Sequence, residues 1–374
     1  MRTAVTGADP WPFGATYSES RSLFLAACAA KDVFTATYPY RAGPGLFGEN
    51  DQSAQIACDV AYFGDPAAET LLIVNSATHG AEGGCGSGLQ TAWIQSGLGE
   101  ELPETVGVLM IHALNPWGFA HLARTTEENV DLNRNFVDFA QKPAPNKAYN
   151  RFHPMAVPVD WSAKTEARLR DQIKSFRAEI GEAAFQNAMR AGQYDHPSGI
   201  GYGGAAPTWS RRLMEHLLGL YAAHRRQVAF IDLHTGIGPV GERTYLCFHG
   251  RGSSALTRAA SWWGDAVLAG SADNEAGLTA YRGLLFEGIT PIIPDVDLTV
   301  LCVEFGTTGF EEVQLAISAD VWRRTCREKS AADDRRAADL IQRSFFPLDR
   351  AWQVQVLPLG LETIAQAIEG LAAT

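Results

Sequence analysis

Short apolar runs alternate with longer stretches of helical period along most of the chain. Four runs are continuously apolar, as buried strands are, and a fifth alternates between apolar and polar residues: 70–76, 106–114, 228–234, 298–304 and 54–63. Four other stretches repeat apolar residues with the period of a helix: 17–31, 84–96, 162–191 and 208–226. Strands separated by helices pair in parallel through crossover connections, so the pattern predicts an α/β fold with a mostly parallel central sheet.

Residues 141–226 interrupt this rhythm. The first part, 141–158, carries four prolines and no clear period, so we expect a loop there. In the helical stretch 208–226, Leu213, Leu217 and Leu220 are spaced four and three residues apart, which predicts one apolar face. We therefore expect 141–226 to be a loop and helical insertion, and 1–14, rich in Gly, Pro and Trp, to be a loose lead-in.

The composition is that of an ordinary globular protein and limits the class of partner. A net charge of −11 argues against nucleic acid and against an anionic membrane surface, although local Arg groups can still bind an anionic small substrate. Six cysteines without a C-x-x-C spacing favour a reduced, cytoplasmic protein. Leu25–Cys28 looks like a lipoprotein cleavage box, but too few apolar residues precede it, since a signal peptide needs roughly 7–15. No apolar run approaches the roughly 20 residues of a membrane span.

One segment combines an imidazole and a carboxylate at the end of an apolar run. In the sequence from Leu71 to Gly84, His79 and Glu82 lie three positions apart in a loop of small residues. A catalytic zinc site uses such nitrogen and oxygen ligands and leaves one position open for water. A single H-x-x-E arises easily by chance, so its meaning depends on the rest of the chain.

Three further segments supply matching chemistry in a compatible order. Arg124 precedes the polar segment Asn129–Phe136, His234 ends the apolar run that starts at Val228, and Glu304 ends the run that starts at Leu298. Ligands of open α/β sheets bind at the carboxyl ends of strands, so these distant residues can meet at one edge of the sheet. Because candidate site residues extend from 79 to 304, we expect residues 1–374 to form a single domain.

These segments resemble the zinc carboxypeptidase superfamily, which includes aspartoacylase-like and succinylglutamate-desuccinylase-like deacylases. The chain more closely resembles the DUF2817 family within it, over about residues 15–350. The shared motifs are Tyr17–Arg21, Ser76–Gly83, Asp131–Phe136 and Gly192–Gly199. The resemblance implies a mixed, mostly parallel central sheet with helices on both faces.

The resemblance also implies a role for each candidate residue. His79, Glu82 and His234 would bind zinc, which suits imidazole ligands better than magnesium does. Glu304 would serve as general base and acid. Arg124 would stabilise the oxyanion of the scissile carbonyl. A free carboxylate of the substrate would be held by Asn133 and Arg134, since a guanidinium pairs with a carboxylate through two hydrogen bonds.

Some assignments stay open in the sequence. Tyr281 is our candidate for a tyrosine over the substrate, and Tyr202 and Tyr245 are alternatives. Asp232 lies on the same side of its strand as His234 and either orients the site or binds nearby backbone. We expect His112, His121 and His196 to be core or surface residues rather than ligands. Cys85 is not expected to be catalytic.

The sequence as a whole predicts a zinc-dependent hydrolase that cleaves an amide bond adjacent to a free carboxylate. A small molecule or a peptide with that carboxylate would be the substrate, so the enzyme is either a carboxypeptidase or an N-acyl amino acid deacylase. Two alternatives use the same residues: a non-catalytic zinc-binding or scaffold protein on this fold, and a zinc esterase. A scaffold has no need of Glu304, which favours the enzyme. Nothing in the pattern indicates an oligomeric state.

Overall fold

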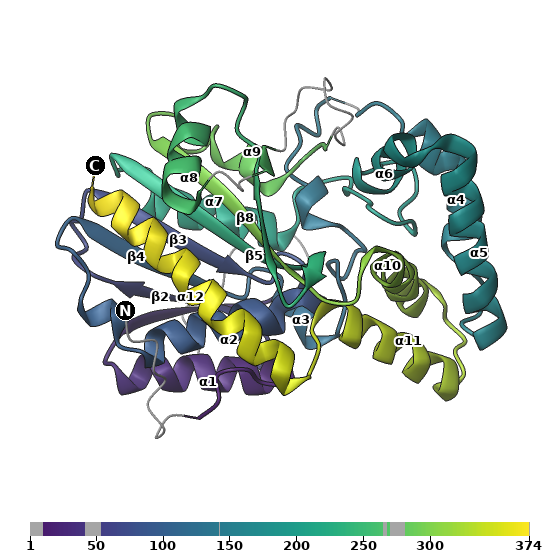
Figure 1. Cartoon of the computed structure of the whole chain (residues 1–374), viewed down its shortest axis with the longest axis horizontal. Helices are drawn as coiled ribbons and strands as arrows, with labels where there is room; N and C mark the ends of the chain where they lie inside the picture. Colours follow the sequence, from purple (N-terminus) through teal and green to yellow (C-terminus); the bar gives the residue numbers. More distant parts are fainter. Residues whose placement is uncertain (1–9, 42–53, 142, 265–267, 270–280, 374) are drawn as a thin grey trace.

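The core of the protein is an eight-stranded sheet with the strand order β1-β2-β4-β3-β5-β8-β6-β7 (Figure 1). The computed structural model describes residues 10–41, 54–141, 143–264, 268–269 and 281–373. The strands span Phe34–Pro39 (β1), Ala57–Phe63 (β2), Thr70–Ser76 (β3), Val106–His112 (β4), Gln227–Val240 (β5), Arg243–Cys247 (β6), Leu268–Ala269 (β7) and Asp297–Gly306 (β8).

The middle of the sheet is parallel and its flanks are mixed. Strands β4, β3, β5 and β8 run in the same direction, and so do β6 and β7. The pairs β1 with β2, β2 with β4, and β6 with β8 are antiparallel. Strands β3 and β4 are buried along their whole length, as expected where both faces of a sheet are covered. The predicted mixed, mostly parallel sheet with helices on both faces is confirmed.

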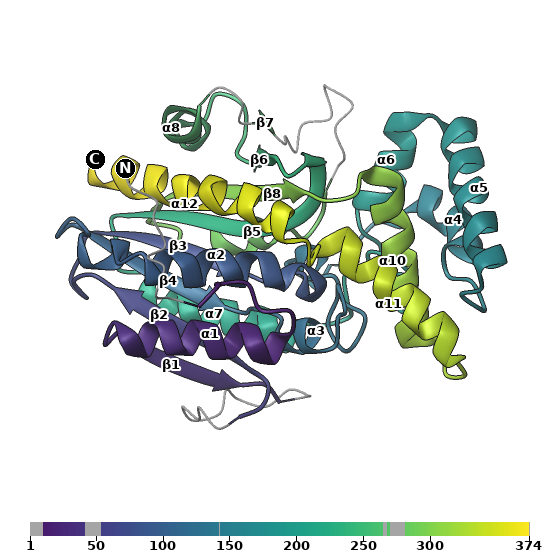
Figure 2. The same ribbon diagram turned by 60° about the horizontal axis from the view of Figure 1, so that its bottom comes forward.

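Helices cover the two faces of this sheet through two hydrophobic clusters (Figures 1 and 2). The first cluster joins the sheet to α1, α2, α8 and α12 through side chains such as Phe24, Trp93 and Val356. The second joins the opposite face to α7 and α9 through Leu213 and Leu285. The α-helices span Tyr17–Ala30 (α1), Gly83–Gln95 (α2), Pro116–Ala120 (α3), Lys147–Ala156 (α4), Ala163–Ile180 (α5), Glu182–Arg190 (α6), Trp209–Tyr221 (α7), Ser254–Trp263 (α8), Leu285–Ile289 (α9), Phe310–Thr325 (α10), Ala331–Phe345 (α11) and Arg350–Ala372 (α12). Three short 3-10 helices span Gly80–Glu82 (η1), Leu98–Glu100 (η2) and Leu132–Arg134 (η3).

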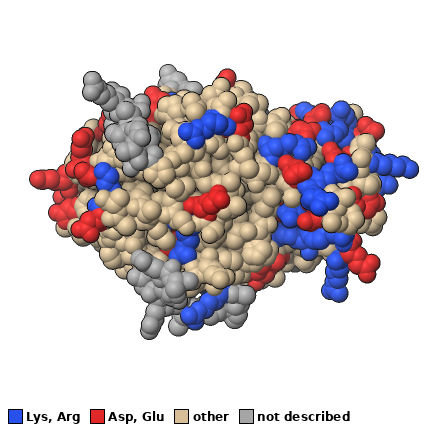
Figure 3. Space-filling view, turned by 90° about the horizontal axis from the view of Figure 1, so that it is seen from below, with Lys and Arg blue, Asp and Glu red and all other residues tan. Residues whose placement is uncertain are grey.

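A third group of helices lies beyond the sheet, on the right in Figures 1 and 2. Helices α4, α5, α6, α10 and α11 pack around their own cluster, which includes Phe152, Trp161, Phe185 and Trp322. Many of the Lys and Arg side chains visible in Figure 3 lie on this group. A protein with a net charge of −11 therefore still has a region rich in basic side chains.

The prediction of a loop over 141–158 is wrong, because this stretch contains α4. The side chain of Asn146 caps the helix by accepting a hydrogen bond from the backbone N–H of Tyr149. Tyr149, Phe152 and Ala156 are buried, at the spacing of one helical face. The prolines hid this period, but only Pro154 lies inside the helix, near its end.

Two helical predictions need correction. The stretch 162–191 forms two helices, α5 and α6, because Gly181 between them has a φ of 82°, which only glycine adopts readily. Leu220 does not belong to the buried face of α7, since it is 51% exposed. That face continues from Leu217 to Leu218 instead.

Four further predictions concern the lead-in, the number of domains, the cysteines and membrane spans. Residues 1–9 of the predicted lead-in lie outside the described residues, while Trp11 and Phe13 pack against the first cluster. The assignment of 1–374 to one domain, with 141–226 as an insertion, stays a prediction. All six cysteines are free. Among the helices of the described residues, none has both the length and the apolar character needed to cross a membrane.

Candidate active site

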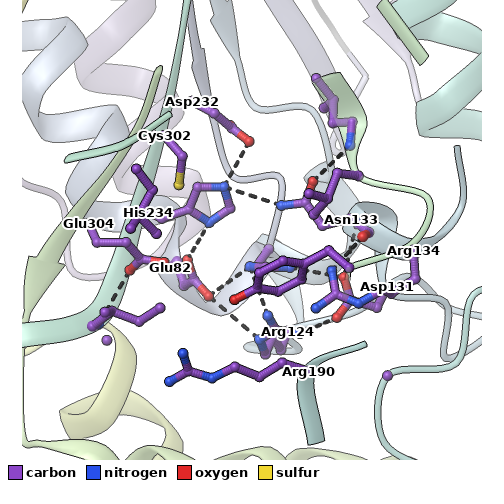
Figure 4. Close-up of a pocket in the computed structure, with 18 of the residues that line it drawn as sticks. Glu82, Arg124, Asp131, Asn133, Arg134, Arg190, Asp232, His234, Cys302 and Glu304 are labelled. Carbon is purple, nitrogen blue, oxygen red and sulfur yellow. Dashed lines mark hydrogen bonds and ion pairs between the residues drawn. The ribbon is translucent and has the colours of Figure 1, made fainter. Parts of the chain in front are cut away.

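The predicted ligands meet at the carboxyl ends of three neighbouring parallel strands. His79 follows the end of β3, His234 lies on β5 and Glu304 lies on β8. Glu82 ends η1, where the chain turns from the His79 loop into α2. Because β3, β5 and β8 are adjacent in the sheet, the four side chains surround one cavity (Figure 4).

Glu82 is placed by the tight packing of the helix that follows it. Helix α2 contains glycines where aromatic rings from distant segments touch its backbone. A Cβ at Gly84 would lie 2.3 Å from the ring of Phe346, and one at Gly88 would lie 2.2 Å from the ring of Phe13. These glycines therefore permit the close approach that holds α2, and with it Glu82, against the sheet.

His79, Glu82 and His234 form a buried cluster of metal-binding atoms. Nδ1 of His79 lies 2.9 Å from Oε1 of Glu82, and Nδ1 of His234 lies 2.9 Å from Oε2 of the same carboxylate. The candidate ligand atoms all lie within 4.8 Å of one another. The two imidazoles thus approach one carboxylate from its two oxygens, each with the same ring nitrogen.

The other nitrogen of each imidazole is held by a buried aspartate. Nε2 of His79 lies 3.0 Å from Oδ1 of Asp131, and Nε2 of His234 lies 2.7 Å from Oδ2 of Asp232. Asp232 is itself fixed, since Asn75 and Thr78 donate hydrogen bonds of 2.8 Å to its other oxygen. A histidine that binds a metal commonly donates its remaining N–H to a carboxylate in this way.

This arrangement fits a metal ion by the chemistry of its donors. If each Nε2 carries the hydrogen that its aspartate accepts, both Nδ1 atoms present lone pairs toward the acceptor oxygens of Glu82. Arg124 donates to Nδ1 of His79 at 3.1 Å, which also requires a lone pair there. Acceptors that face one another need a proton or a metal cation between them, so these positions suit a metal ion once the protons are displaced. Two imidazoles and one carboxylate suit zinc better than the hard cations calcium or magnesium.

Burial and neighbouring charges shift the pKa values of this cluster in opposite directions. Burial alone would raise the pKa of Glu82, but His79 and His234 outweigh it and lower that pKa. For His234, burial would lower the pKa, yet Asp232 and Glu82 raise it well above its ordinary value. Burial also opposes ionisation of Asp131, whose pKa Arg124 and His79 nevertheless hold well below the usual range.

Glu304 lies beside the cluster but is not paired with it. Its carboxylate accepts a hydrogen bond of 3.3 Å from the backbone N–H of Ile237, and no cation of the described residues forms an ion pair with it. Burial raises its pKa to about 8, and the charge of Glu82 adds to this, while His234 and Arg190 oppose it. A carboxyl group with such a pKa can both accept and return a proton near neutral pH.

Arg124 reaches the cavity from the loop after α3. Its Nη1 donates to Oδ2 of Asp131 at 2.7 Å, and its Nε lies 3.6 Å from Oε1 of Glu82. The buried carboxylate of Asp320 on α10 accepts a hydrogen bond from its backbone N–H. The Arg124 guanidinium is therefore fixed next to the candidate metal ligands.

Asn133 and Arg134 lie together on another side of the cavity (Figure 4), and Tyr281 also lines it. Oδ1 of Asn133 accepts from the backbone N–H of Leu285 at 3.0 Å, and its Nδ2 lies 3.5 Å from Nε2 of His234. The guanidinium of Arg134 lies over the ring of Tyr281, 5.2 Å from its centroid. The Nε of Arg134 is buried without a hydrogen-bond partner in the described part of the chain, so this group has a donor to spare.

The inner end of the cavity is apolar. Behind His234 and Asn133 it is lined by side chains that share this character, namely Phe230, Leu246, Phe248, Phe286 and Val300. Cys302 on β8 also lines the cavity.

The structure separates the remaining candidates from the cavity. Tyr245 points into the first cluster and hydrogen-bonds Thr363 at 2.8 Å, so it does not reach the site. His112 is buried against Ser87, His121 stacks on Trp117 at the surface, and His196 stacks on His153. These histidines are core or surface residues, as predicted.

Several cavity residues were not assigned a role from the sequence. Asp131 lies inside a motif that we recognised, and its position two residues before Asn133 was the available signal. Arg190 and Gln314 also line the cavity, but they come from α6 and α10, where no motif marks them. The loop at 199–204 contributes Ile200 and Gly201 to the lining of the cavity.

Comparisons with known proteins identify the family and the fold of this chain. A sequence profile of the family described as "Protein of unknown function (DUF2817)" matches residues 13–358. A comparison with curated proteins gave no match. The chain is similar to the structure of bovine thrombin-activatable fibrinolysis inhibitor in complex with a tick carboxypeptidase inhibitor, with 12% identity, 96% of this chain and 98% of that chain covered, and a TM-score of 0.51.

Two other solved structures are less similar. Carboxypeptidase A from Helicoverpa armigera is 11% identical, over 87% of this chain and 73% of that chain, with a TM-score of 0.47. A succinylglutamate desuccinylase from a Silicibacter species is 12% identical, over 78% of this chain and 64% of that chain, with a TM-score of 0.36. The profile match and the likeness to the bovine protein confirm the family resemblance and the fold that the sequence indicated.

Proposed function

The chain belongs to the DUF2817 family, and we propose that it is a zinc-dependent hydrolase that cleaves an amide bond adjacent to a free carboxylate. The observation that carries the proposal is the pair of imidazoles whose Nδ1 atoms face the two oxygens of Glu82 while buried aspartates hold their Nε2 atoms. His79, Glu82 and His234 would hold the zinc. When bound, zinc supplies Lewis-acid chemistry, which lowers the pKa of water toward about 7 and polarises a carbonyl group.

Glu304 would move the protons of the reaction. Its carboxylate takes a proton from the attacking water and returns it to the nitrogen that leaves when the amide bond breaks. It has no ion-pair partner in the described chain, so its Oε1 is free for these transfers. Its backbone neighbour Ile237 holds only one oxygen, through a single hydrogen bond.

Arg124 would stabilise the negative charge that develops on the carbonyl oxygen. One of its amino groups is fixed by Asp131, and the other donates to Nδ1 of His79. With His79 serving as a metal ligand, this second amino group would be free to donate to the carbonyl oxygen of the substrate, while Asp131 keeps the guanidinium in place. A donor fixed in this way costs little reorganisation during the reaction.

Asn133 and Arg134 would bind the free carboxylate of the substrate. The unpartnered Nε of Arg134 and its planar fork suit two carboxylate oxygens. Tyr281 lies over this guanidinium and would close the site above the bound group. The apolar inner end would take the side chain next to that carboxylate, so Phe or Leu are the expected residues there.

Metal analysis followed by hydrolysis assays tests the proposal. We expect about one zinc per chain, because three protein ligands and one water complete a four-coordinate zinc site. We also expect hydrolysis of N-acyl-phenylalanine or of short peptides ending in Phe. Zinc without hydrolysis of either class would favour the non-catalytic alternative, and hydrolysis of the matching esters alone would favour the esterase.

A further inference from the structure

Arg190 lines the cavity on the side of Glu304, away from Arg134. In Figure 4 its side chain passes below Arg124, and its guanidinium lies toward Glu304. If the free carboxylate lies at Arg134 and the scissile carbonyl at the metal ligands, this side receives the acyl part of the substrate. We infer that Arg190 binds a carboxylate in the acyl part, so that preferred substrates are anionic on both sides of the cleaved bond. This inference rests on the proposed function and names its substrate class.

Arg190 has no carboxylate partner of its own. It lies in the last turn of α6, half-buried, and no ion pair joins it to a carboxylate within the described ranges. Its guanidinium lies over the ring of Phe310, 5.4 Å from the centroid. The charge of Arg190 acts on Glu304 but forms no ion pair with it, so the donors of its guanidinium are available to an anionic ligand.

A second arginine, Arg177, lies over the same ring but differs from Arg190 in its partners and position. The guanidinium of Arg177 lies 5.3 Å from the centroid of Phe310, but Arg177 forms an ion pair with Glu182 and does not line the cavity. The charge of Arg190 also acts on Glu182, but Glu182 already has Arg177 as its ion-pair partner. Of this pair, only Arg190 is available to a ligand in the cavity.

Gln314 provides an independent polar group on the same wall. It lies on α10, is 3% exposed and lines the cavity. Its Oε1 is buried and has no hydrogen-bond partner among the described residues. Buried polar atoms are rarely left unsatisfied, so this oxygen indicates a donor that arrives with the ligand. An N–H group of the acyl part or of an upstream residue would satisfy it while Arg190 binds the carboxylate.

The acyl carboxylate can come from two kinds of compound that share this chemistry. It can end a dicarboxylic acyl group, as in N-succinyl-phenylalanine, or belong to an acidic residue, as in N-acetyl-Glu-Phe. Each has a neutral partner of the same shape, N-succinamoyl-phenylalanine and N-acetyl-Gln-Phe. Comparison of the two pairs identifies the source of the carboxylate.

The experiment measures kcat/KM for both pairs with the zinc-loaded wild type, Arg190→Gln and the control Arg151→Gln, which changes an exposed arginine paired with Glu179 outside the cavity. We expect the wild type to prefer the acid in at least one pair by roughly 10- to 100-fold, as for a charged hydrogen bond. Arg190→Gln should remove that preference by slowing only the acid, while Arg151→Gln should retain it. Equal rates for acid and neutral partner in the wild type, or equal slowing of both by Arg190→Gln, would overturn the inference.

Binding measurements separate this inference from the proposed function. Calorimetry on Glu304→Gln, with and without Arg190→Gln, gives the Kd for the same compounds without turnover. Tighter binding of an acid that disappears with Arg190→Gln supports the subsite even if the wild type hydrolyses none of the compounds. Hydrolysis without any preference for the acid leaves the proposed function intact and removes the role of Arg190.

Discussion

Glu304 and His234 are direct register partners on the parallel strands β8 and β5. Neighbouring strands lie about 4.8 Å apart, so the sheet itself fixes the distance between a candidate metal ligand and the candidate base. The two residues are far apart in the chain, yet backbone hydrogen bonds on both sides hold them in place. The chemistry proposed for Glu304 therefore needs no loop movement to bring it to the metal ligands.

The first prediction concerns metal content. Replacing His79, Glu82 or His234 with Ala should sharply lower the zinc bound per chain, because each variant removes a direct bond to the ion. Elemental analysis of the purified variants measures this. His121→Ala, which changes a surface histidine, is the matched control and should keep its zinc. Full zinc content in His234→Ala would remove that residue from the site.

The second prediction concerns protons released when zinc binds. In the metal-free protein, Asp232 and Glu82 outweigh burial and raise the pKa of His234 well above its ordinary value, and burial raises that of Glu304 to about 8. Both groups then carry a proton at pH 7. Zinc favours neutral imidazole and charged carboxylate, so binding should release roughly one to two protons.

Calorimetry in buffers of different ionisation enthalpy counts these protons. Zinc affinity should fall as the pH is lowered, because protons compete more strongly below the metal-free pKa values. Glu304→Gln should release fewer protons than the wild type. Binding at pH 7 without proton release would show that the metal-free site is already deprotonated.

The third prediction separates metal binding from catalysis. Glu304→Gln should keep its zinc and its fold but lose about 10²–10⁴-fold in kcat, or roughly 3–5 kcal/mol of transition-state stabilisation. Glu311→Gln, at the half-buried start of α10 and outside the cavity, is the control and should retain its activity. An unchanged kcat in Glu304→Gln with any good substrate would refute the role of this residue.

The fourth prediction concerns the free carboxylate. Arg134→Ala should lower kcat/KM about 10- to 150-fold on a substrate with a free carboxylate, since a charged hydrogen bond is worth roughly 1.5–3 kcal/mol. The matched amide should already be a poor substrate and should lose little more. Arg282→Ala, whose guanidinium binds the backbone of Ala144 outside the cavity, is the control. Equal hydrolysis of acid and amide by the wild type would exclude this anchor.

Five of the strands, β2, β3, β4, β5 and β8, and the ligand positions could be predicted because they depend on local patterns, whereas β1, β6 and β7 were not predicted. Apolar runs that end in His79, His234 and Glu304 specify buried strands with polar ends, and a parallel sheet brings such ends together. The motif order then identified Arg124, Asn133 and Arg134, all of which line the cavity. Their roles still require the experiments above.

Other features depend on contacts that no local pattern records. The period of α4 was hidden by prolines that mostly lie outside the helix, and Leu220 is exposed because nothing packs on that side of α7 within the described chain. Arg190 and Gln314 face the cavity only because the third group of helices packs beside the strand ends. The role of Asp131 follows from its contact with Nε2 of His79, which the sequence does not record.

The packing of α2 has a consequence for the order in which the site is built during synthesis. His79 and Glu82 leave the ribosome early, yet the ring of Phe346 that packs on Gly84 is made more than two hundred residues later. Until then, the helix that starts at Glu82 lacks one of the surfaces that hold it. The nascent chain should therefore have its ligands without their final geometry, and tight metal loading should follow release of the finished protein.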